Sequence, residues 1–220
     1  MTRAPRKRTA VPPISAILRE LDALYPDAHC ELQYQTPFQL LVATILSAQC
    51  TDKRVNLVTP KLFARFPDAH AMAKAKPAEL EEIIRSTGFF RNKTKNILGA
   101  SKLLCDRWHG QVPQTMDELL ELPGVARKTA NVILGTAFEK NVGFVVDTHI
   151  GRLARRLGLS KQEDPVKVER DLCVCIPREK WTQAGHQLIW HGRRVCTAQR
   201  PNCAACRLAP YCPSDQTREG

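Results

Sequence analysis

The ten-residue segment 122–131, LPGVARKTAN, places the strongest constraint on the fold of this chain. Upstream of it, Thr115 and Glu118 have the spacing of a capping box, which predicts a short helix from about residue 116. Pro123 and Gly124 end that helix, because proline lacks the N–H group that continues a helix and glycine tolerates a tight turn. Apolar residues then recur at helical spacing: Ala130, Ile133, Leu134, Ala137 and Phe138. The pattern predicts two helices joined by a tight hairpin over residues 115–138.

The first turn of the second helix carries two cations, Arg127 and Lys128. Cations are disfavoured at this end of a helix, where exposed N–H groups carry partial positive charge. A docked phosphate would explain them, since the N–H groups of a helix start together with Arg127 and Lys128 make a phosphate site. Gly124 and Ala126, in the turn before them, are DNA-binding candidates with Arg127. Two solvated cations beside an ordinary turn are the alternative, and charge placement alone favours neither.

Helical spacing continues through the rest of the chain. It is clearest in the apolar residues at positions 14, 17, 18, 21 and 24, and again at positions 38, 41, 42 and 45. No stretch longer than a few residues alternates between polar and apolar side chains, as a half-buried strand would. We therefore expect an all-α fold, preceded by a flexible basic arm over residues 1–13.

A formal net charge of +11 over 220 residues indicates a polyanionic partner, nucleic acid first and an acidic membrane surface second. No apolar run approaches the roughly 20 residues that a transmembrane helix needs, so we expect no membrane-spanning segment. The basic arm lacks the apolar core of a secretory signal. An arm that touches DNA is favoured, and a short organelle transit segment is a lesser alternative.

Two loops carry residues that could enter DNA. Gln49 ends an otherwise apolar helix, where it is either a surface glutamine or an amide that bonds a base edge. The surface reading is favoured on this residue alone. The pair Phe89 and Phe90 is followed by Arg91 and Lys93, which combines an apolar wedge with cations for phosphates. We expect at least one phenylalanine to pack beneath its loop instead.

Asp147 follows an apolar stretch in the sequence VVDTH and precedes a basic helix. Aspartate is a common N-cap, so a structural role is the simple interpretation. The same carboxylate could also take part in chemistry at the hairpin, with Lys128.

Nine cysteines, without a secretory signal, indicate a reducing compartment. Five of them are scattered and are expected to be small buried hydrophobic residues. The other four form a C-x6-C-x2-C-x5-C pattern near the C-terminus: Cys196, Cys203, Cys206 and Cys212. Such a cluster indicates a metal site, and either zinc or an iron–sulfur cluster suits four thiolates. Arg200 and other arginines nearby would give this segment a phosphate-binding surface.

A lysine amine at the hairpin could attack C1′ of a deoxyribose, displace the base and form a Schiff base. That intermediate can lose its 3′ phosphate by β-elimination. A carboxylate such as Asp147 would accept a proton or stabilise positive charge on the sugar. The base must first leave the stack, and an inserted wedge and amide lower that cost.

Four motifs in one order resemble the endonuclease III family of helix-hairpin-helix DNA glycosylases. They are LSAQ-x-TD (46–52), LPGVARKTAN (122–131), VDTH (146–149) and the four-cysteine cluster, and the resemblance covers residues 14–212. It implies a six-helix barrel domain over residues 30–140. It also implies a discontinuous [4Fe–4S] domain, built from residues 14–29 and 141–220.

The resemblance also implies residue roles. Lys128 would be the Schiff-base nucleophile and Asp147 the catalytic aspartate. Gln49 would fill the gap left by a flipped nucleotide, Phe89 would be the wedge, and His149 would lie near the DNA. The four clustered cysteines would hold the [4Fe–4S] cluster.

The implied substrate is duplex DNA that contains oxidised pyrimidines, such as thymine glycol, or abasic sites. We expect a monomer in the bacterial cytoplasm, associated with the nucleoid. The alternatives are a monofunctional adenine-mismatch glycosylase, a non-catalytic DNA-binding protein of the same hairpin type, and a zinc-binding nucleic-acid protein. The first lacks a lysine at position 128 and carries an extra C-terminal domain, so it fits this chain poorly.

The chain departs from the family pattern at two places. Ala126 replaces a second hairpin glycine, which would add strain if this position needs a positive φ, or would hinder a phosphate if it lies close to one. Phe89 and Phe90 stand where a smaller aliphatic residue is usual. Neither change affects the expected chemistry, and we expect Ala126→Gly to raise DNA affinity.

Overall fold

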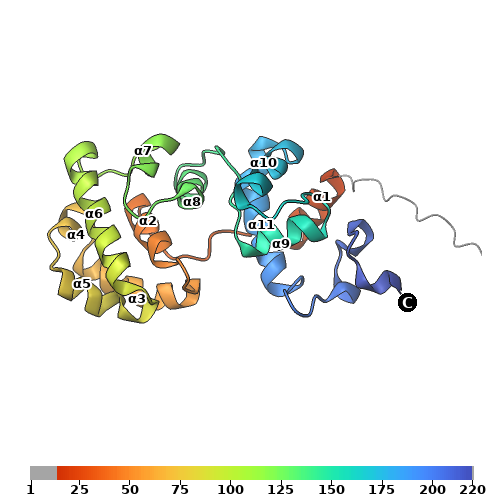
Figure 1. Cartoon of the computed structure of the whole chain (residues 1–220), viewed down its shortest axis with the longest axis horizontal. Coiled ribbons are helices and arrows are strands. Elements are labelled where there is room, and N and C mark those ends of the chain that lie inside the picture. The colour runs from red at the N-terminus through yellow and green to blue at the C-terminus, as the bar shows by residue number, and fades with distance from the viewer. Residues whose placement is uncertain (1–13, 220) are drawn as a thin grey trace, which may run out of the picture. The chain divides into compact units, whose positions relative to one another are not determined.

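The structure is a computed structural model that describes residues 14–219. Its described residues form helices and no strand, so the expected all-α class is confirmed (Figure 1). The expected basic arm over residues 1–13 lies outside the described residues. The chain divides into two compact units, one over Cys30–Val142 and the other made of the chain up to His29 together with the chain from Gly143 onward.

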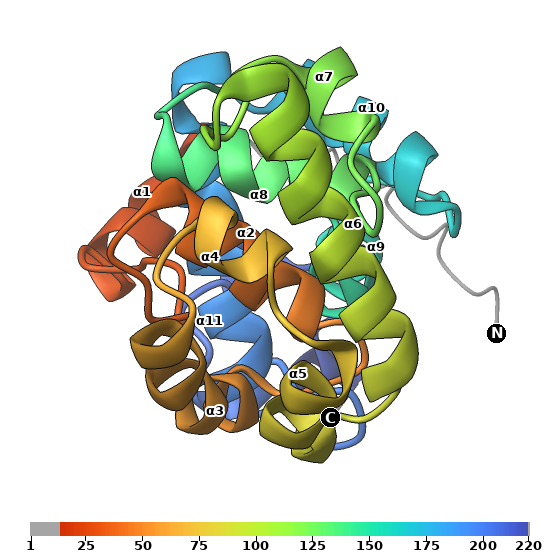
Figure 2. The same cartoon turned by 90° about the vertical axis from the view of Figure 1, so that its left-hand side faces the viewer.

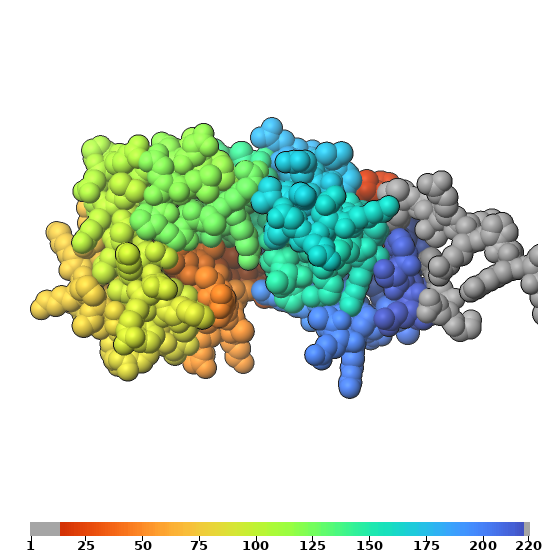
Figure 3. Space-filling view, in the orientation of Figure 1, coloured from red at the N-terminus to blue at the C-terminus, as the bar shows by residue number. Residues whose placement is uncertain are grey.

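The unit over Cys30–Val142 is built around α2 (Pro37–Leu46), in which nine of the ten residues are buried. Figures 1 and 2 both place α2 in the middle of this unit, in contact with α6 (Phe90–Trp108) and α8 (Arg127–Ala137). In Figure 3 the green atoms of the α6-to-α8 stretch cover much of this unit's visible face. The remaining elements are α3 (Asp52–Arg65), α4 (Ala69–Ala73), α5 (Pro77–Ile84), η1 (Arg85–Thr87) and α7 (Met116–Leu120). Leucine, isoleucine and valine side chains from these helices form one continuous core.

The hairpin between α7 and α8 forms where the sequence predicts it. Thr115 Oγ1 accepts a hydrogen bond from the N–H of Glu118, which begins α7. Gly124 has a φ of 80°, and a Cβ at this position would lie 2.8 Å from the Cβ of Asn96. Glycine is therefore required both by the backbone conformation and by the close approach of α6.

The second unit begins with α1 (Ile14–Leu24), which contacts α11 (Trp181–Arg194) near the other end of the chain. A polar network joins the two segments. Asp22 accepts hydrogen bonds from Lys180 Nζ at 2.7 Å and from Gln187 Nε2 at 3.0 Å. The bond from Lys180, more than any other influence, lowers the pKa of the Asp22 carboxyl.

The rest of this unit comprises α9 (Thr148–Arg156), α10 (Pro165–Cys175) and four short 3₁₀ turns: η2 (Arg178–Lys180), η3 (Cys203–Ala205), η4 (Ala209–Tyr211) and η5 (Gln216–Glu219). Helices α9 and α11 pack directly on each other, and α10 contacts α9. Their apolar faces form a second, smaller core with α1. None of the helices in the described part of the chain is both long enough and apolar enough to cross a membrane.

Candidate active site and cysteine pocket

Lys128 is an exposed side chain in the first turn of α8. The N-cap of this helix, Ala126, has no side chain that can accept a hydrogen bond from the first turn. The free N–H groups of a helix start bind water or a ligand when no cap is present. The arrangement therefore places an accessible amine beside an uncapped helix start, the kind of helix end at which anions bind in other proteins.

The backbone conformation of Ala126 decides whether this residue adds strain, which is one of the two effects expected of it. Its φ is −103° and its ψ is 172°, which is an extended conformation open to any residue. Alanine therefore adds no strain here, and the strain alternative is wrong. The remaining effect is steric, because the exposed methyl group lies at the helix end where a phosphate would dock.

Asp147 is the N-cap of α9, and its Oδ1 accepts a hydrogen bond from the N–H of Ile150 at 2.8 Å. The structural role expected from the sequence is therefore confirmed. The cap uses one of the two carboxylate oxygens, and the side chain is only half-buried. A proton-accepting role is therefore compatible with the cap. Asp147 and Lys128 belong to different units of the chain.

Gln49 and Phe89 are both exposed and both have left-handed backbones, with φ of 53° and 46°. Phe89 is 63% exposed, as expected of a residue that enters DNA. The neighbouring Phe90 packs against the core of its unit, and the guanidinium groups of Arg85 and Arg91 lie over its ring at 5.7 Å and 5.4 Å. One phenylalanine of the pair is thus structural, as the sequence predicts.

The structure corrects the expectation for Lys93. Its side chain is 4% exposed, and its Nζ donates hydrogen bonds to the carbonyl oxygens of Leu46 and Thr87. An ammonium group held inside the protein by two carbonyls is not available to a phosphate. Arg91, two residues earlier, is exposed and remains a candidate for that contact.

The remaining predicted DNA contacts lie in the second unit. His149 Nδ1 is 3.2 Å from Arg152 Nη2, and its side chain is half-buried. Arg200 is exposed, and its carbonyl accepts a hydrogen bond from Thr197 Oγ1 at 2.7 Å. The turn around Arg200 is thereby fixed beside the cysteine segment.

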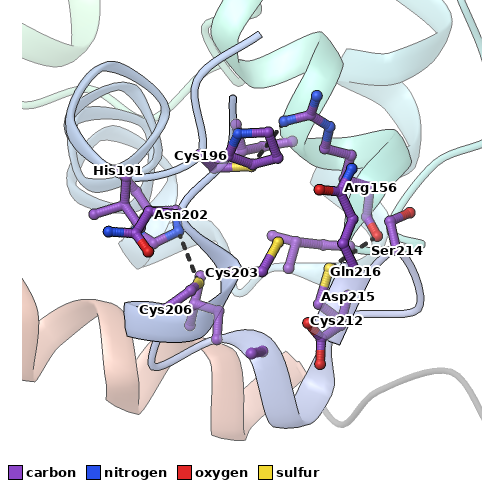
Figure 4. A pocket seen from close by; sticks show the side chains of 16 residues that line it. Arg156, His191, Cys196, Asn202, Cys203, Cys206, Cys212, Ser214, Asp215 and Gln216 are labelled. Atoms are coloured by element: carbon purple, nitrogen blue, oxygen red, sulfur yellow. Dashed lines mark hydrogen bonds between the residues drawn. The ribbon is translucent and has the colours of Figure 1, made fainter. Parts of the chain in front are cut away.

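The four clustered cysteines line one cavity of about 150 Å³, and Figure 4 shows their sulfur atoms around a common space. This volume is several times the ~30 Å³ that a water molecule takes up in the liquid. Among the described residues, no three His, Cys, Asp or Glu side chains lie close enough to hold one metal ion. A polynuclear cluster needs no such crowding, because its ligands bind different irons. Four thiols around one cavity suit either zinc or an iron–sulfur cluster, as the sequence indicates.

Two thiols in this cavity have raised pKa values. Burial is the main cause for both Cys206 and Cys212. These cysteines bind a metal centre only as thiolates, and a nearby positive charge, from the metal centre or from the protein, is needed to stabilise that form. Arg156 supplies one such charge, because its Nη1 donates to Cys196 Sγ at 3.1 Å. Arg156 also accepts a hydrogen bond from the Cys212 thiol through its carbonyl oxygen.

His191 supports the opposite side of the same cavity. Its Nε2 is 3.4 Å from Cys206 Sγ (Figure 4). Its Nδ1 is 3.0 Å from the hydroxyl of Tyr25. Sequence reasoning did not identify Arg156, His191 or Tyr25. The signal for the arginine was the spacing of Arg152 and Arg156 on one face of α9, and Arg152 also donates to the Cys196 carbonyl.

Comparisons with known proteins agree with this description. Residues 42–178 match the model of the HhH-GPD superfamily of base excision DNA repair proteins. The endonuclease III of Synechocystis sp. is 58% identical over 91% of each chain, and that of Bacillus subtilis is 42% identical over 94% of each. A solved non-covalent endonuclease III–DNA complex aligns with a TM-score of 0.88 at 44% identity, covering 94% of this chain and 96% of the other. A thermostable thymine-DNA glycosylase, at 20% identity and a TM-score of 0.81, shares the fold. The chain therefore belongs to the HhH-GPD superfamily, as a DNA glycosylase and abasic-site lyase of the endonuclease III type.

Proposed function

We propose that Lys128 is the nucleophile of this enzyme. The observation that carries the proposal is the exposed amine of Lys128 at an uncapped helix start, inside the hairpin motif. The helix end and Arg127 would hold a DNA phosphate, which places the amine beside the sugar of the same strand. Gly124 makes the tight turn that leads to this helix end, and the methyl group of Ala126 would limit how closely the phosphate approaches.

In the proposed reaction, the lone pair of Lys128 Nζ forms a bond to C1′ while the bond from C1′ to the base breaks. The base leaves with the electron pair and takes up a proton. Ring opening then gives a protonated Schiff base between Lys128 and the sugar. Loss of a C2′ proton expels the 3′ phosphate, and water hydrolyses the imine to release the lysine.

Asp147 would accept the proton that the attacking amine loses, or stabilise positive charge on the sugar as the base departs. Its hydrogen bond to the N–H of Ile150 fixes the carboxylate, so the group needs no reorganisation during the step. Gln49 and Phe89 would enter the duplex where the damaged nucleotide leaves it. Arg91, His149 and Arg200 would contact the DNA around that position.

Cys196, Cys203, Cys206 and Cys212 would hold a [4Fe–4S] cluster. Four metal–sulfur bonds would cross-link a segment that has only short 3₁₀ turns and little apolar core of its own. The cross-linked segment would present Arg200 to a DNA phosphate. Arg156 and His191 would orient the ligands through their contacts to sulfur.

The substrate we propose is duplex DNA that contains oxidised pyrimidines or abasic sites. The support is the 58% identity to an endonuclease III and the fold shared with an endonuclease III–DNA complex. We propose that the protein acts as a monomer on the chromosome, in the cytoplasm of a bacterial cell.

Borohydride trapping tests the nucleophile. Duplex DNA with an abasic site is incubated with the wild type, with Lys128→Ala, and with Lys102→Ala as a matched control from an exposed position of α6. We expect a covalent adduct with the wild type and the control, and a loss of about 10⁴-fold or more in lyase rate with Lys128→Ala. An adduct that persists in Lys128→Ala would assign the amine elsewhere. If no adduct forms in any protein while DNA binding is intact, the chain is a binding protein without lyase activity.

A further inference from the structure

Lys93 is a buried cation with two specific partners. It lies in the first turn of α6, with its Nζ 2.8 Å from the carbonyl oxygen of Leu46 and 2.7 Å from that of Thr87. Moving an ammonium group out of water is costly unless hydrogen bonds replace the hydration. Burial accordingly lowers the pKa of Lys93, and the charge of Cys50 opposes that effect to a smaller extent.

Both partners lie at the ends of helical segments. Leu46 is the last residue of α2 and Thr87 is the last residue of η1. Carbonyl groups at such positions have no donor from the next helical turn. Lys93 therefore satisfies two helix ends that are distant in sequence, and it ties them to the start of a third helix.

Each helix end leads directly into a residue that the proposed function places in DNA. Gln49 follows Leu46 by three positions, and Phe89 follows Thr87 by two. Both are non-glycine residues in the left-handed region, and in the described part of the chain only His109 and Glu139 share that property. Such conformations cost about 1–3 kcal/mol each and persist only where the surrounding structure fixes them.

The Phe89 side chain cannot supply that restraint, because it is 63% exposed. The restraint must come from the backbone around it. On one side of the residue, the Thr87 carbonyl is held by Lys93 Nζ. On the other, the Phe89 carbonyl accepts a hydrogen bond from the Lys93 N–H at 3.1 Å. Lys93 thus makes two hydrogen bonds to the backbone around Phe89 and one to the backbone that leads to Gln49.

We propose that Lys93 is a positioning residue that fixes the distance between Gln49 and Phe89, so that both side chains can enter the duplex at one nucleotide. This inference rests on the proposed roles of those two residues. A gap-filling pair is effective only if its two members are held ready before DNA binds, because ordering them during binding would offset part of the gain.

The first test compares Lys93→Met with Lys102→Met, a matched loss of charge from an exposed position on the same helix. We expect Lys93→Met to slow base excision from thymine glycol duplexes by roughly 10- to 100-fold, since small misplacements of positioning groups have effects of that order. Lys102→Met should stay within about twofold of the wild type. Thermal unfolding of each variant reports whether it is folded, and Lys93→Gln, which retains a donor, replaces Lys93→Met if that variant does not fold.

A double-mutant cycle separates positioning from general stability. If Lys93 acts through the wedge, adding Lys93→Met to Phe89→Ala should slow excision further by less than about threefold, because coupled residues are not additive. An undiminished loss in the Phe89→Ala background would overturn the proposal.

Nucleotide flipping provides a readout that does not depend on the chemical step. The fluorescence of 2-aminopurine placed beside the lesion rises when its neighbour leaves the stack. We expect the rise with the wild type and with Lys128→Ala, and a smaller rise with Lys93→Met. An equal rise with Lys93→Met would contradict the positioning role. If the wild type shows the rise but forms no borohydride adduct, the proposed chemistry fails while the positioning role stands.

Discussion

Helices α8 and α9 begin in opposite ways. Helix α9 starts at a charged side chain, Asp147, that accepts a hydrogen bond from its own first turn. Helix α8 starts at Ala126, which offers no acceptor, and its first two residues are the cations Arg127 and Lys128. Six α-helices in the described part of the chain have an N-terminal side-chain cap. Capping is therefore common in this sequence, and α8 differs from these helices.

The difference separates two uses of a helix start. At α9 the protein satisfies its own N–H groups, and the capping carboxylate is held in a fixed position. At α8 no side chain caps the first turn, as the proposed binding of a DNA phosphate requires, and Lys128 is exposed to solvent. A rigid proton acceptor and an accessible nucleophile are the two properties that the proposed reaction requires.

The largest expected effect comes from a substitution that keeps the capping role of Asp147 and removes its proposed role as a proton acceptor. Asparagine caps a helix about as well as aspartate but cannot accept the proton. We expect Asp147→Asn to lower the excision rate by about 10²–10⁴-fold at nearly unchanged stability. Asp147→Ala should lose the same activity and about 1 kcal/mol of unfolding free energy as well. Single-turnover kinetics and urea unfolding measure the two effects, and an active Asp147→Asn would reduce Asp147 to a cap.

A smaller effect is expected from pH, which should destabilise the unit that contains α9 more than the unit that contains α8. Helix α9 packs on α11, where burial and, to a lesser extent, the charge of His29 lower the pKa of His186 to about 4. The unfolded state has an ordinary histidine pKa near 6.5, so it binds a proton that the folded state does not. The contribution of neutral His186 to the unfolding free energy is therefore complete above about pH 6.5. It is lost as the pH falls towards 4, by roughly 3 kcal/mol in total.

Amide hydrogen exchange of the two helices between pH 7 and pH 5 measures that loss. After correction for the intrinsic exchange rate, protection in α9 should fall more than protection in α8. The variant His186→Gln should remove about half of the difference, because burial also lowers the pKa of His191, on the same helix, to about 4. Equal losses in both helices, or an unchanged slope in His186→Gln, would show that His186 does not control the response.

The smallest expected effect comes from giving α8 the cap that it lacks. Serine at position 126 can accept a hydrogen bond from the first turn, so Ala126→Ser should raise the unfolding free energy by about 0.5–1 kcal/mol. The same bond competes with a phosphate, and DNA affinity should fall severalfold. Ala126→Gly removes the methyl group instead and should raise affinity by a smaller factor. Fluorescence anisotropy with abasic duplex DNA tests both variants, and tighter binding by Ala126→Ser would contradict the open helix end.

Local rules account for the parts of the site that were predicted from sequence. Capping residues and turn residues act on neighbours within about four positions, so the hairpin at 115–138 and the cap at Asp147 could be read from the chain. Four cysteines within 17 residues were equally visible, and the structure places them around one cavity.

The residues whose roles could not be predicted from the sequence make contacts across long sequence separations. Lys93 looked like a surface cation because a run of basic residues surrounds it, but its partners include a carbonyl 47 positions away. Tyr25 reaches His191 across 166 positions, and only the packing of α1 on α11 brings them together. A side chain that satisfies distant backbone groups has no local pattern, so its role depends on the fold.

The pairing of α1 with α11 has a consequence for synthesis of the protein. Helix α1 is synthesised before the helices that bury its apolar face, which all follow residue 143. The unit over Cys30–Val142 has its complete core earlier and can fold while translation continues. The apolar face of α1 therefore stays uncovered until those later helices have been synthesised. Insertion of the proposed cluster, whose four cysteines follow α11, would then complete the unit that begins with α1.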